Sequence, residues 1–124
     1  MNQLVSVAKA LSDPSRVRIL FVLRQRELCV CELSDSLAMT QSTLSTHLQV
    51  IRQAELVSGR KEGKWMYYRI APHAQGLLGY LFQSFMPSMK KDAVLSRDAK
   101  NRKGRLRLRN GDSCCVGFSE KGCK

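Results

Sequence analysis

The segment QSTLSTHLQVIRQAELVSGRKEGKWMYYRI, residues 41–70, contains the pattern that decides the fold of this chain. Its first half predicts a helix over residues 41–54, because apolar residues recur at spacings of four and three. Thr40 suits the N-cap of that helix, since its hydroxyl can accept a hydrogen bond from an amide of the first turn. The apolar residues of the predicted helix are Leu44, Leu48 and Ile51.

The opposite side of this predicted helix is polar and consists mostly of short side chains. Such side chains can bond to base edges or phosphates when a helix lies in the major groove of DNA, and glutamine can pair with adenine through two hydrogen bonds. We therefore expect this side to read DNA. The candidate DNA-binding residues are Gln41, Ser42, Thr43, Ser45, Thr46 and His47.

The second half of the segment changes from helical to extended periodicity. Residues 57–60 and 65–70 are rich in β-branched and aromatic side chains, and they flank a turn that contains Gly63. This pattern predicts a β-hairpin with basic residues near its tip. Basic side chains there would neutralise phosphates and fix the position of the protein on DNA. The candidates are Arg60, Lys61 and Lys64.

Helical spacing of apolar residues predicts three helices before the reading helix, over about residues 3–11, 14–26 and 31–38. Asp13 and Pro14 suit the cap and the first position of the second of these helices. Two helices joined by a tight turn and followed by a basic hairpin form a winged helix-turn-helix. The expected fold is therefore mainly α with a small β-hairpin.

A last helix is expected from Pro72 to about Met86. Residues 71–89 contain no Lys, Arg, Asp or Glu, so this helix is too apolar for a free surface helix. We expect it to bury a face against a second copy of the chain; closure of the domain's own core is the alternative. Residues 1–89 would then form the DNA-binding and dimerisation domain.

The net charge of the 124-residue chain is +11, from 21 Lys and Arg against 10 Asp and Glu. Such a balance favours polyanions such as DNA as partners. Residues 90–124 carry much of the excess, and we expect them to form a flexible basic tail. No run of 18 apolar residues and no signal-peptide pattern occurs, so no membrane association and a cytoplasmic location are expected.

Three stretches of the chain resemble the ArsR/SmtB family of metal-responsive bacterial repressors: ALSDPSRVRIL at 10–20, ELCVCEL at 27–33, and residues 41–70. The resemblance covers about residues 4–86 and includes the spacing between the stretches. It implies a homodimer formed through the first and last helices. It also implies a repressor of a resistance operon that leaves DNA when a toxic metal or metalloid binds. The positions that match the family's reading helix are Gln41, Ser42, Ser45, Thr46 and His47.

Cys29 and Cys31 form a C-V-C motif at the start of the predicted helix 31–38. Side chains two residues apart in a regular helix point about 200° apart, so both thiols share one side only where the chain is extended or distorted. A helix N-terminus favours the thiolate that binds metal. The motif resembles the family's arsenite- and antimonite-sensing site, and As(III) or Sb(III) is therefore the expected inducer. Two inert, buried cysteines are the alternative.

Two thiols leave the expected site incomplete, because trivalent arsenic bonds three thiolates in a pyramidal arrangement. Related arsenite repressors often have a third cysteine where this chain has Ser34, and this chain has no cysteine before Cys29. Water, glutathione or another cysteine would have to join. The remaining cysteines are Cys114, Cys115 and Cys123. These either form a separate three-sulfur site, complete the first pair, or have no role in binding.

Other functions are less favoured by the residues present. Residues 74–89 contain no Asp, Glu or His, so the zinc site that related proteins have on their dimer helices is not expected. The small number of histidines favours a soft, sulfur-bound ion. A Cd(II)-, Pb(II)- or Zn(II)-responsive repressor and a thiol redox switch remain alternatives. A Gly-rich phosphate loop and a nucleophile elbow are both absent from the sequence, so an enzyme is not expected.

Overall fold

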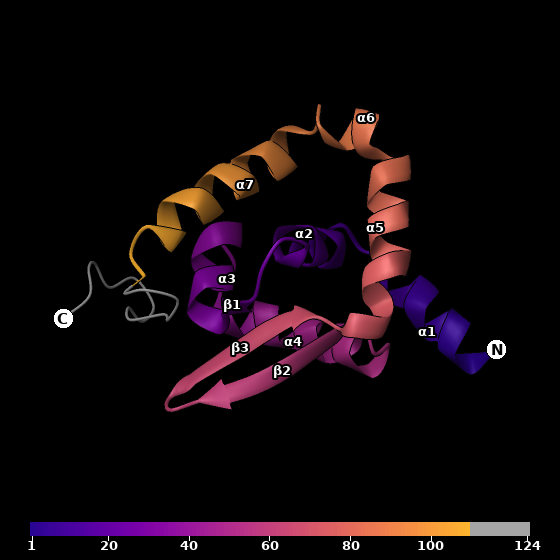
Figure 1. Cartoon of the computed structure of the whole chain (residues 1–124), viewed down its shortest axis with the longest axis horizontal. Coiled ribbons are helices and arrows are strands. Elements are labelled where there is room, and N and C mark those ends of the chain that lie inside the picture. Colours follow the sequence, from indigo (N-terminus) through magenta and orange to yellow (C-terminus); the bar gives the residue numbers. More distant parts are fainter. Residues whose placement is uncertain (110–124) are drawn as a thin grey trace.

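The computed structural model describes residues 1–109, which form a mainly helical domain with one small sheet (Figure 1). The first half contains helices α1 (Asn2–Ala10), α2 (Pro14–Leu23), α3 (Val30–Leu37) and α4 (Gln41–Gln53), with strand β1 (Leu28–Cys29) directly before α3. Strands β2 (Val57–Glu62) and β3 (Trp65–Ile70) follow. The later elements are the 3-10 turn η1 (Pro72–Ala74) and helices α5 (Gln75–Ser84), α6 (Met86–Met89) and α7 (Ala93–Leu106).

Side-chain caps fix where the early helices begin. The Asp13 carboxylate accepts a hydrogen bond from the Ser15 amide at 2.8 Å, and Pro14 occupies the first turn of α2. The Thr40 hydroxyl accepts one from the Thr43 amide at 3.3 Å at the start of α4. Both expected caps are confirmed. Ala38, with φ of 54°, ends α3 in the left-handed region and turns the chain toward α4.

The expected hairpin is confirmed, and it belongs to a three-stranded antiparallel sheet of order β1-β3-β2. Gly63 turns the chain at the hairpin tip with φ of 59°, a conformation that glycine adopts without strain. The added strand is β1, in which Leu28 pairs with Tyr68 and Cys29 pairs with Tyr67. The C-V-C motif therefore begins on a sheet strand and continues into a helix.

The hydrophobic core lies between α2, α3, α4 and the sheet. The expected inward residues of α4 are buried, and Leu33 and Leu37 of α3 pack in the same cluster. Each such side chain stabilises the fold by about 1.5–3 kcal/mol through removal from water. This packing anchors α4 by one side and leaves its polar side exposed.

The end of the chain differs from the expectation in two ways. The helix expected from residue 72 to 86 is a 3-10 turn followed by α5, and Pro87 lies within the first turn of the short helix α6, where proline is tolerated. A flexible extension was expected from residue 90, but over residues 93–106 the structure has α7. The Asp92 carboxylate caps α7 by accepting from the amides of Val94 and Leu95 at 2.9 and 3.1 Å.

Helix α7 runs beside α3 and also contacts α2 (Figure 1). Leu95 of α7 packs in the hydrophobic core. Two ion pairs add to this contact: Arg18 of α2 donates to Asp98 at 2.8 and 3.0 Å, and Arg105 donates to Asp35 of α3 at 2.6 Å. Among the residues from 1 to 109, no helix is both long and apolar enough to cross a membrane.

Candidate functional site

The polar face of α4 is presented to solvent as expected. Gln41, Ser42, Thr43, Ser45 and Thr46 are exposed, and His47 is half-buried. The Thr46 hydroxyl donates to the Ser42 carbonyl at 3.0 Å, so its oxygen remains oriented as an acceptor at the surface.

His47 connects the reading helix to α2. A guanidinium nitrogen of Arg16 lies 3.5 Å from His47 Nδ1, while the same side chain donates to the carbonyls of Ala10 and Lys9 at 3.0 and 2.8 Å. Arg16 thereby joins the end of α1 to α4. Sequence periodicity did not single out Arg16, because its partners lie on other elements.

The basic residues of the hairpin differ in their surroundings. Arg60 donates to Glu27 at 2.6–3.0 Å and to Glu62 at 3.1 Å, and its guanidinium carbon lies 4.5 Å from the centre of the Tyr67 ring. The hydrogen bonds to Glu27 and then to Glu62 raise the pKa of Arg60 above its ordinary value. Lys61 and Lys64 are exposed, with Lys64 placed over Trp65 at 4.9 Å. Of the three residues expected to contact phosphate, Arg60 therefore already has carboxylate partners that neutralise its charge.

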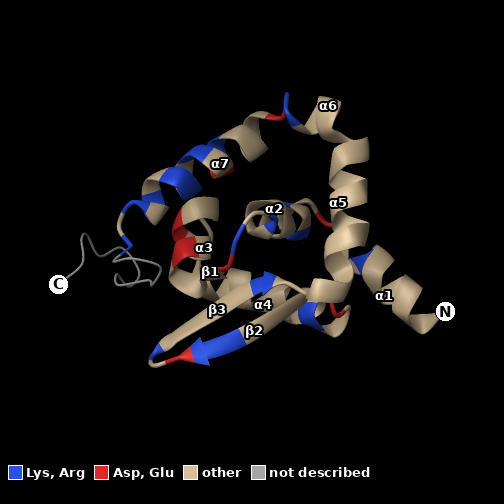
Figure 2. Cartoon of the chain, in the orientation of Figure 1, with Lys and Arg blue, Asp and Glu red and all other residues tan. Residues whose placement is uncertain are grey.

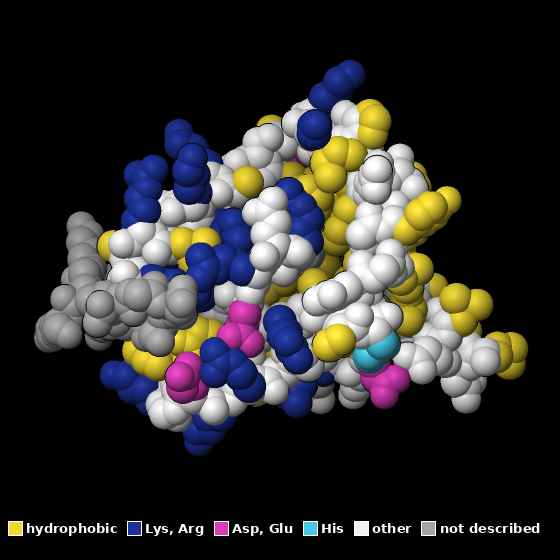
Figure 3. Space-filling view, viewed as in Figure 1, with side chains coloured by type: hydrophobic (Ala, Val, Ile, Leu, Met, Phe, Trp, Pro, Cys, Tyr) yellow, Lys and Arg dark blue, Asp and Glu magenta, His cyan; other side chains and the backbone are white. Residues whose placement is uncertain are grey.

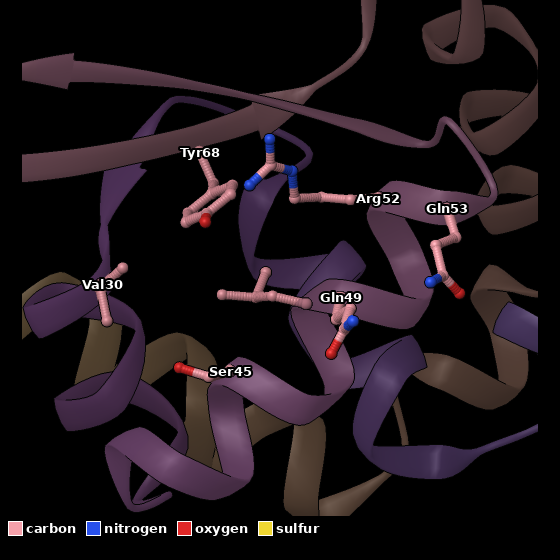
Figure 4. A pocket seen from close by; sticks show the side chains of 7 residues that line it. Val30, Ser45, Gln49, Arg52, Gln53 and Tyr68 are labelled. Atoms are coloured by element: carbon pink, nitrogen blue, oxygen red, sulfur yellow. The ribbon is translucent and has the colours of Figure 1, made fainter.

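A hollow of about 360 Å³ lies between α4, the start of α3 and β3 (Figure 4). The Arg52 guanidinium carbon is 5.8 Å from the centre of the Tyr68 ring on one side of it. Ser45, one of the expected DNA-reading residues, lines the other side (Figure 4). Gln49 thus joins the polar surface of the reading helix, on which Arg52 was already expected, although the expected DNA-binding residues of this helix ended at His47.

The two thiols of the C-V-C motif lie at the strand-to-helix junction before α3. Cys29 is the N-cap residue with extended backbone (φ −81°, ψ 165°), whereas Cys31 lies in the first helical turn. Both are reduced thiols, and both pack against the buried Tyr67 together with Trp65. The change from strand to helix therefore lets residues two apart share one aromatic surface, which a regular helix would prevent.

Ser34, the position of the missing third cysteine, has a structural contact. Its hydroxyl donates to the Met39 carbonyl at 2.5 Å and so secures the turn between α3 and α4. Within residues 1–109, no group of three His, Cys, Asp or Glu side chains could hold a metal ion. Cys114, Cys115 and Cys123 lie outside the described residues.

Glu32 is a fully buried carboxylate directly beside the thiols. It accepts from the Cys29 amide at 2.9 Å and from two guanidinium nitrogens of Arg109 at 2.5 and 2.6 Å. Burial opposes ionisation of Glu32, but the bonds from Arg109 and Cys29 outweigh it, and its pKa lies below the ordinary value. The last described residue, Arg109, is thus fixed next to the C-V-C motif.

An apolar surface covers the side of the molecule formed by α1 and α5 (Figure 3). Leu4 and Tyr80 are each 72% exposed and Phe85 is 60% exposed. Leu4 and Leu77 line one hollow between the two helices. Exposed apolar side chains gathered in this way are typical of an interface between proteins.

The fold and the exposed face of α4 define a winged helix-turn-helix protein of the DNA-binding kind. The sequence profile of bacterial regulatory proteins of the arsR family matches residues 13–58, from the cap of α2 into β2. A solved structure, the homodimeric winged helix-turn-helix DNA-binding domain Mb0332 from Mycobacterium bovis, a possible ArsR-family transcriptional regulator, aligns with a TM-score of 0.66 at 30% identity. The alignment covers 74% of this chain and 86% of that one. This chain therefore belongs to the ArsR family of bacterial regulatory proteins.

Two curated relatives have the same character. The chain is 43% identical over 67 residues to the arsenic resistance transcriptional regulator ArsR1 of Pseudomonas putida. These residues cover 53% of this chain and 52% of that protein. It is 40% identical over 70 residues to the arsenical resistance operon repressor of Escherichia coli, covering 56% and 60%. The matched segment thus spans about half of one relative and three fifths of the other.

Proposed function

We propose that this chain is a homodimeric repressor of a metalloid-resistance operon, released from its operator when As(III) or Sb(III) binds cysteine thiolates. The observation that carries the proposal is the placement of Cys29 and Cys31 on one aromatic surface at the start of α3. Helix α3 packs directly behind the reading helix, so a change at its first turn can reach the DNA-binding face.

The energy needed for such coupling is modest. An inducer that favours the DNA-incompetent state by about 3 kcal/mol weakens DNA binding by roughly a hundredfold. Leu33 and Leu37 of α3 share the core with Leu44 and Leu48 of α4. Since packed cores change between discrete arrangements, displacement of the first turn of α3 would reposition α4 rather than be absorbed locally.

A third ligand is proposed from the tail. Arg109 is held at Glu32, beside Cys29, and Cys114 follows five residues later in the sequence. Five residues of extended chain span up to about 17 Å, which is enough to return to the thiol pair. This supports completion of the Cys29/Cys31 site by Cys114, Cys115 or Cys123, with a separate site in the tail as the alternative.

A titration of the DNA complex tests the inducer. Arsenite, antimonite, Cd(II), Pb(II), Zn(II) and peroxide are added separately to the reduced protein bound to a labelled duplex selected for tight binding. Release by arsenite or antimonite at the lowest concentrations supports the proposal. Release by Cd(II) or Pb(II) alone indicates a divalent-metal sensor, and release by peroxide alone indicates a redox switch; either result contradicts the proposal.

The face of α4 should give sequence-specific affinity. We expect Gln41→Ala to weaken binding to the selected duplex by about tenfold, with little change on unrelated DNA, because glutamine can pair with a base edge. Lys61→Ala should instead weaken binding to the selected duplex and to unrelated DNA by similar factors. It should also reduce the number of counterions released on binding, measured as the slope of log K against log salt concentration, by about one. Fluorescence anisotropy at several salt concentrations measures both, with Gln53→Ala at the far end of α4 as control. Equal losses on both duplexes for Gln41→Ala would contradict base reading.

The apolar surface of α1 and α5 is proposed as the dimer interface. We expect Tyr80→Glu to weaken dimerisation by about 2 kcal/mol, because it removes an aromatic side chain from the interface and places a charge there. Sedimentation equilibrium measures the change, and Gln75→Glu, an exposed residue of the same helix, serves as control. An unchanged dimer in the Tyr80 variant would place the interface elsewhere.

A further inference from the structure

The described chain ends with a contact across the start of α3. Arg109 donates to both oxygens of Glu32, at 2.5 and 2.6 Å, and to the Glu27 carbonyl at 2.9 Å. Glu32 in turn accepts from the Cys29 amide. One buried carboxylate therefore joins the thiol motif to the end of residues 93–109, which comprise α7 and the three residues after it and are called the α7 segment below. Such bidentate arginine–carboxylate pairs are directional as well as strong.

Contacts of this kind run along the whole length of α3. Arg105 bonds to Asp35 at 2.6 Å, the Asn101 side chain bonds to the Ser36 carbonyl at 3.3 Å, and Asp98 bonds to Arg18, which also donates to the Leu37 carbonyl at 2.6 Å. Successive residues of the α7 segment thus meet successively earlier residues of α3. The two lie antiparallel, and the α7 segment reaches the thiol end of α3 last (Figure 1).

The thiols are closed to solvent in this arrangement, because Cys29 is 0% exposed and Cys31 is 5% exposed. A reagent or ion can reach them only after a local opening. Strand β1 is bonded into the sheet and its neighbours belong to the core, so its opening would disrupt many contacts. The end of the α7 segment is fastened mainly by polar contacts at its last turns, and segments of that kind open at lower free energy than core elements.

We propose that the end of the α7 segment is a strap over the thiol pair, fastened by the Arg109–Glu32 ion pair, and that its release sets the rate at which Cys29 and Cys31 react. Arg109 is then a positioning residue of the thiol site. Figure 2 shows basic residues along α7, but Arg109 differs from Arg107, which is exposed, in being tied to a buried carboxylate. The inference deepens the proposed function, on which it rests only for the identity of the inducer.

The test measures thiol labelling without any metalloid. The full-length reduced protein is pulsed with N-ethylmaleimide under native conditions, and the peptide that contains Cys29 and Cys31 is quantified by mass spectrometry. We expect Arg109→Gln to accelerate labelling by roughly tenfold, the population change expected for loss of a charge-assisted pair. Arg109→Lys, which keeps the charge but has only one donating nitrogen, should restore most of the protection, and Arg107→Gln should label at the parent rate.

Hydrogen exchange on the same variants separates local release from general destabilisation. We expect Arg109→Gln to speed exchange in the last turns of α7 and the first turn of α3, while the amides of Leu20 and Val22 in the core of α2 keep the parent rate. Parent-like labelling of Arg109→Gln, or equal acceleration by Arg107→Gln, overturns the strap; so does faster exchange throughout the core. Accelerated labelling in a protein that arsenite fails to release from DNA leaves the strap intact and refutes the proposed inducer.

Discussion

Replacing Cys29 and Cys31 together by serine is expected to leave DNA affinity within about twofold of the parent while raising the arsenite concentration needed for release by roughly a hundredfold. Cys29 and Cys31 are the only cysteines within residues 1–109, and they lie at the start of the helix that packs against the reading helix. Anisotropy of the labelled duplex, with arsenite titrated into the preformed complex, gives both quantities in one experiment.

The fold should tolerate this double substitution. Cys29 is the N-cap of α3 within a capping box with Glu32, and serine is among the best residues at that position. Ser34, a buried hydroxyl in the same helix that already finds a backbone acceptor, shows that α3 accommodates such a side chain. Loss of DNA binding together with loss of induction would indicate a folding defect, which thermal unfolding of the variant reveals.

The three later cysteines provide the matched comparison. If Cys114, Cys115 and Cys123 complete the site at α3, then replacing all three by serine weakens induction together with the Cys29/Cys31 change, and the combined variant shows no further loss. If they form an independent site, the two sets of changes add. A Cys29/Cys31 double variant that responds to arsenite like the parent would contradict the helix site and leave the tail as the sensor.

The parts of the fold that followed from the sequence depend on short-range chemistry. The helix from Gln41, its cap at Thr40 and the hairpin around Gly63 are all specified by spacing and by turn residues within a few positions. The exposed face of α4 is the complement of its buried face, so its candidate DNA residues could be predicted in the same way. The C-V-C motif could be found as well, but its packing on Tyr67 depends on the pairing of β1 with β3.

Helix α7 could not be predicted, because two of the three residues that it buries, Asp98 and Arg105, are charged. Asp98 meets Arg18 at a separation of 80 residues, and Arg105 meets Asp35 at a separation of 70 residues. In the sequence, Asp98 and Arg105 lie in a basic, polar run without apolar periodicity. The same limitation applies to Arg60, whose carboxylate partner Glu27 lies 33 residues earlier.

Breaking one of these pairs should have a large effect on stability. We expect Asp98→Ala to lower the free energy of unfolding by about 3 kcal/mol, because Arg18 would remain largely buried without its counter-charge. The Asp98 side chain is 1% exposed and that of Arg18 is 17% exposed, and the hydrogen bonds to Asp98 raise the pKa of Arg18 above its ordinary value. Urea unfolding followed by circular dichroism measures the change, and the melting temperature should fall by roughly 10 °C.

Two comparisons distinguish the cost of an isolated charge from the loss of packing. Arg97→Ala, at the neighbouring exposed position of α7, should change stability by less than about 0.5 kcal/mol. The double variant Arg18→Met with Asp98→Leu should recover most of the loss, since a buried ion pair can be replaced by apolar side chains of similar volume at little cost. If Asp98→Ala is as mild as Arg97→Ala, then α7 does not depend on this pair. If the double variant is as unstable as the single one, then loss of the hydrogen bond from Arg18 to the Leu37 carbonyl, at 2.6 Å, offsets what the apolar side chains gain.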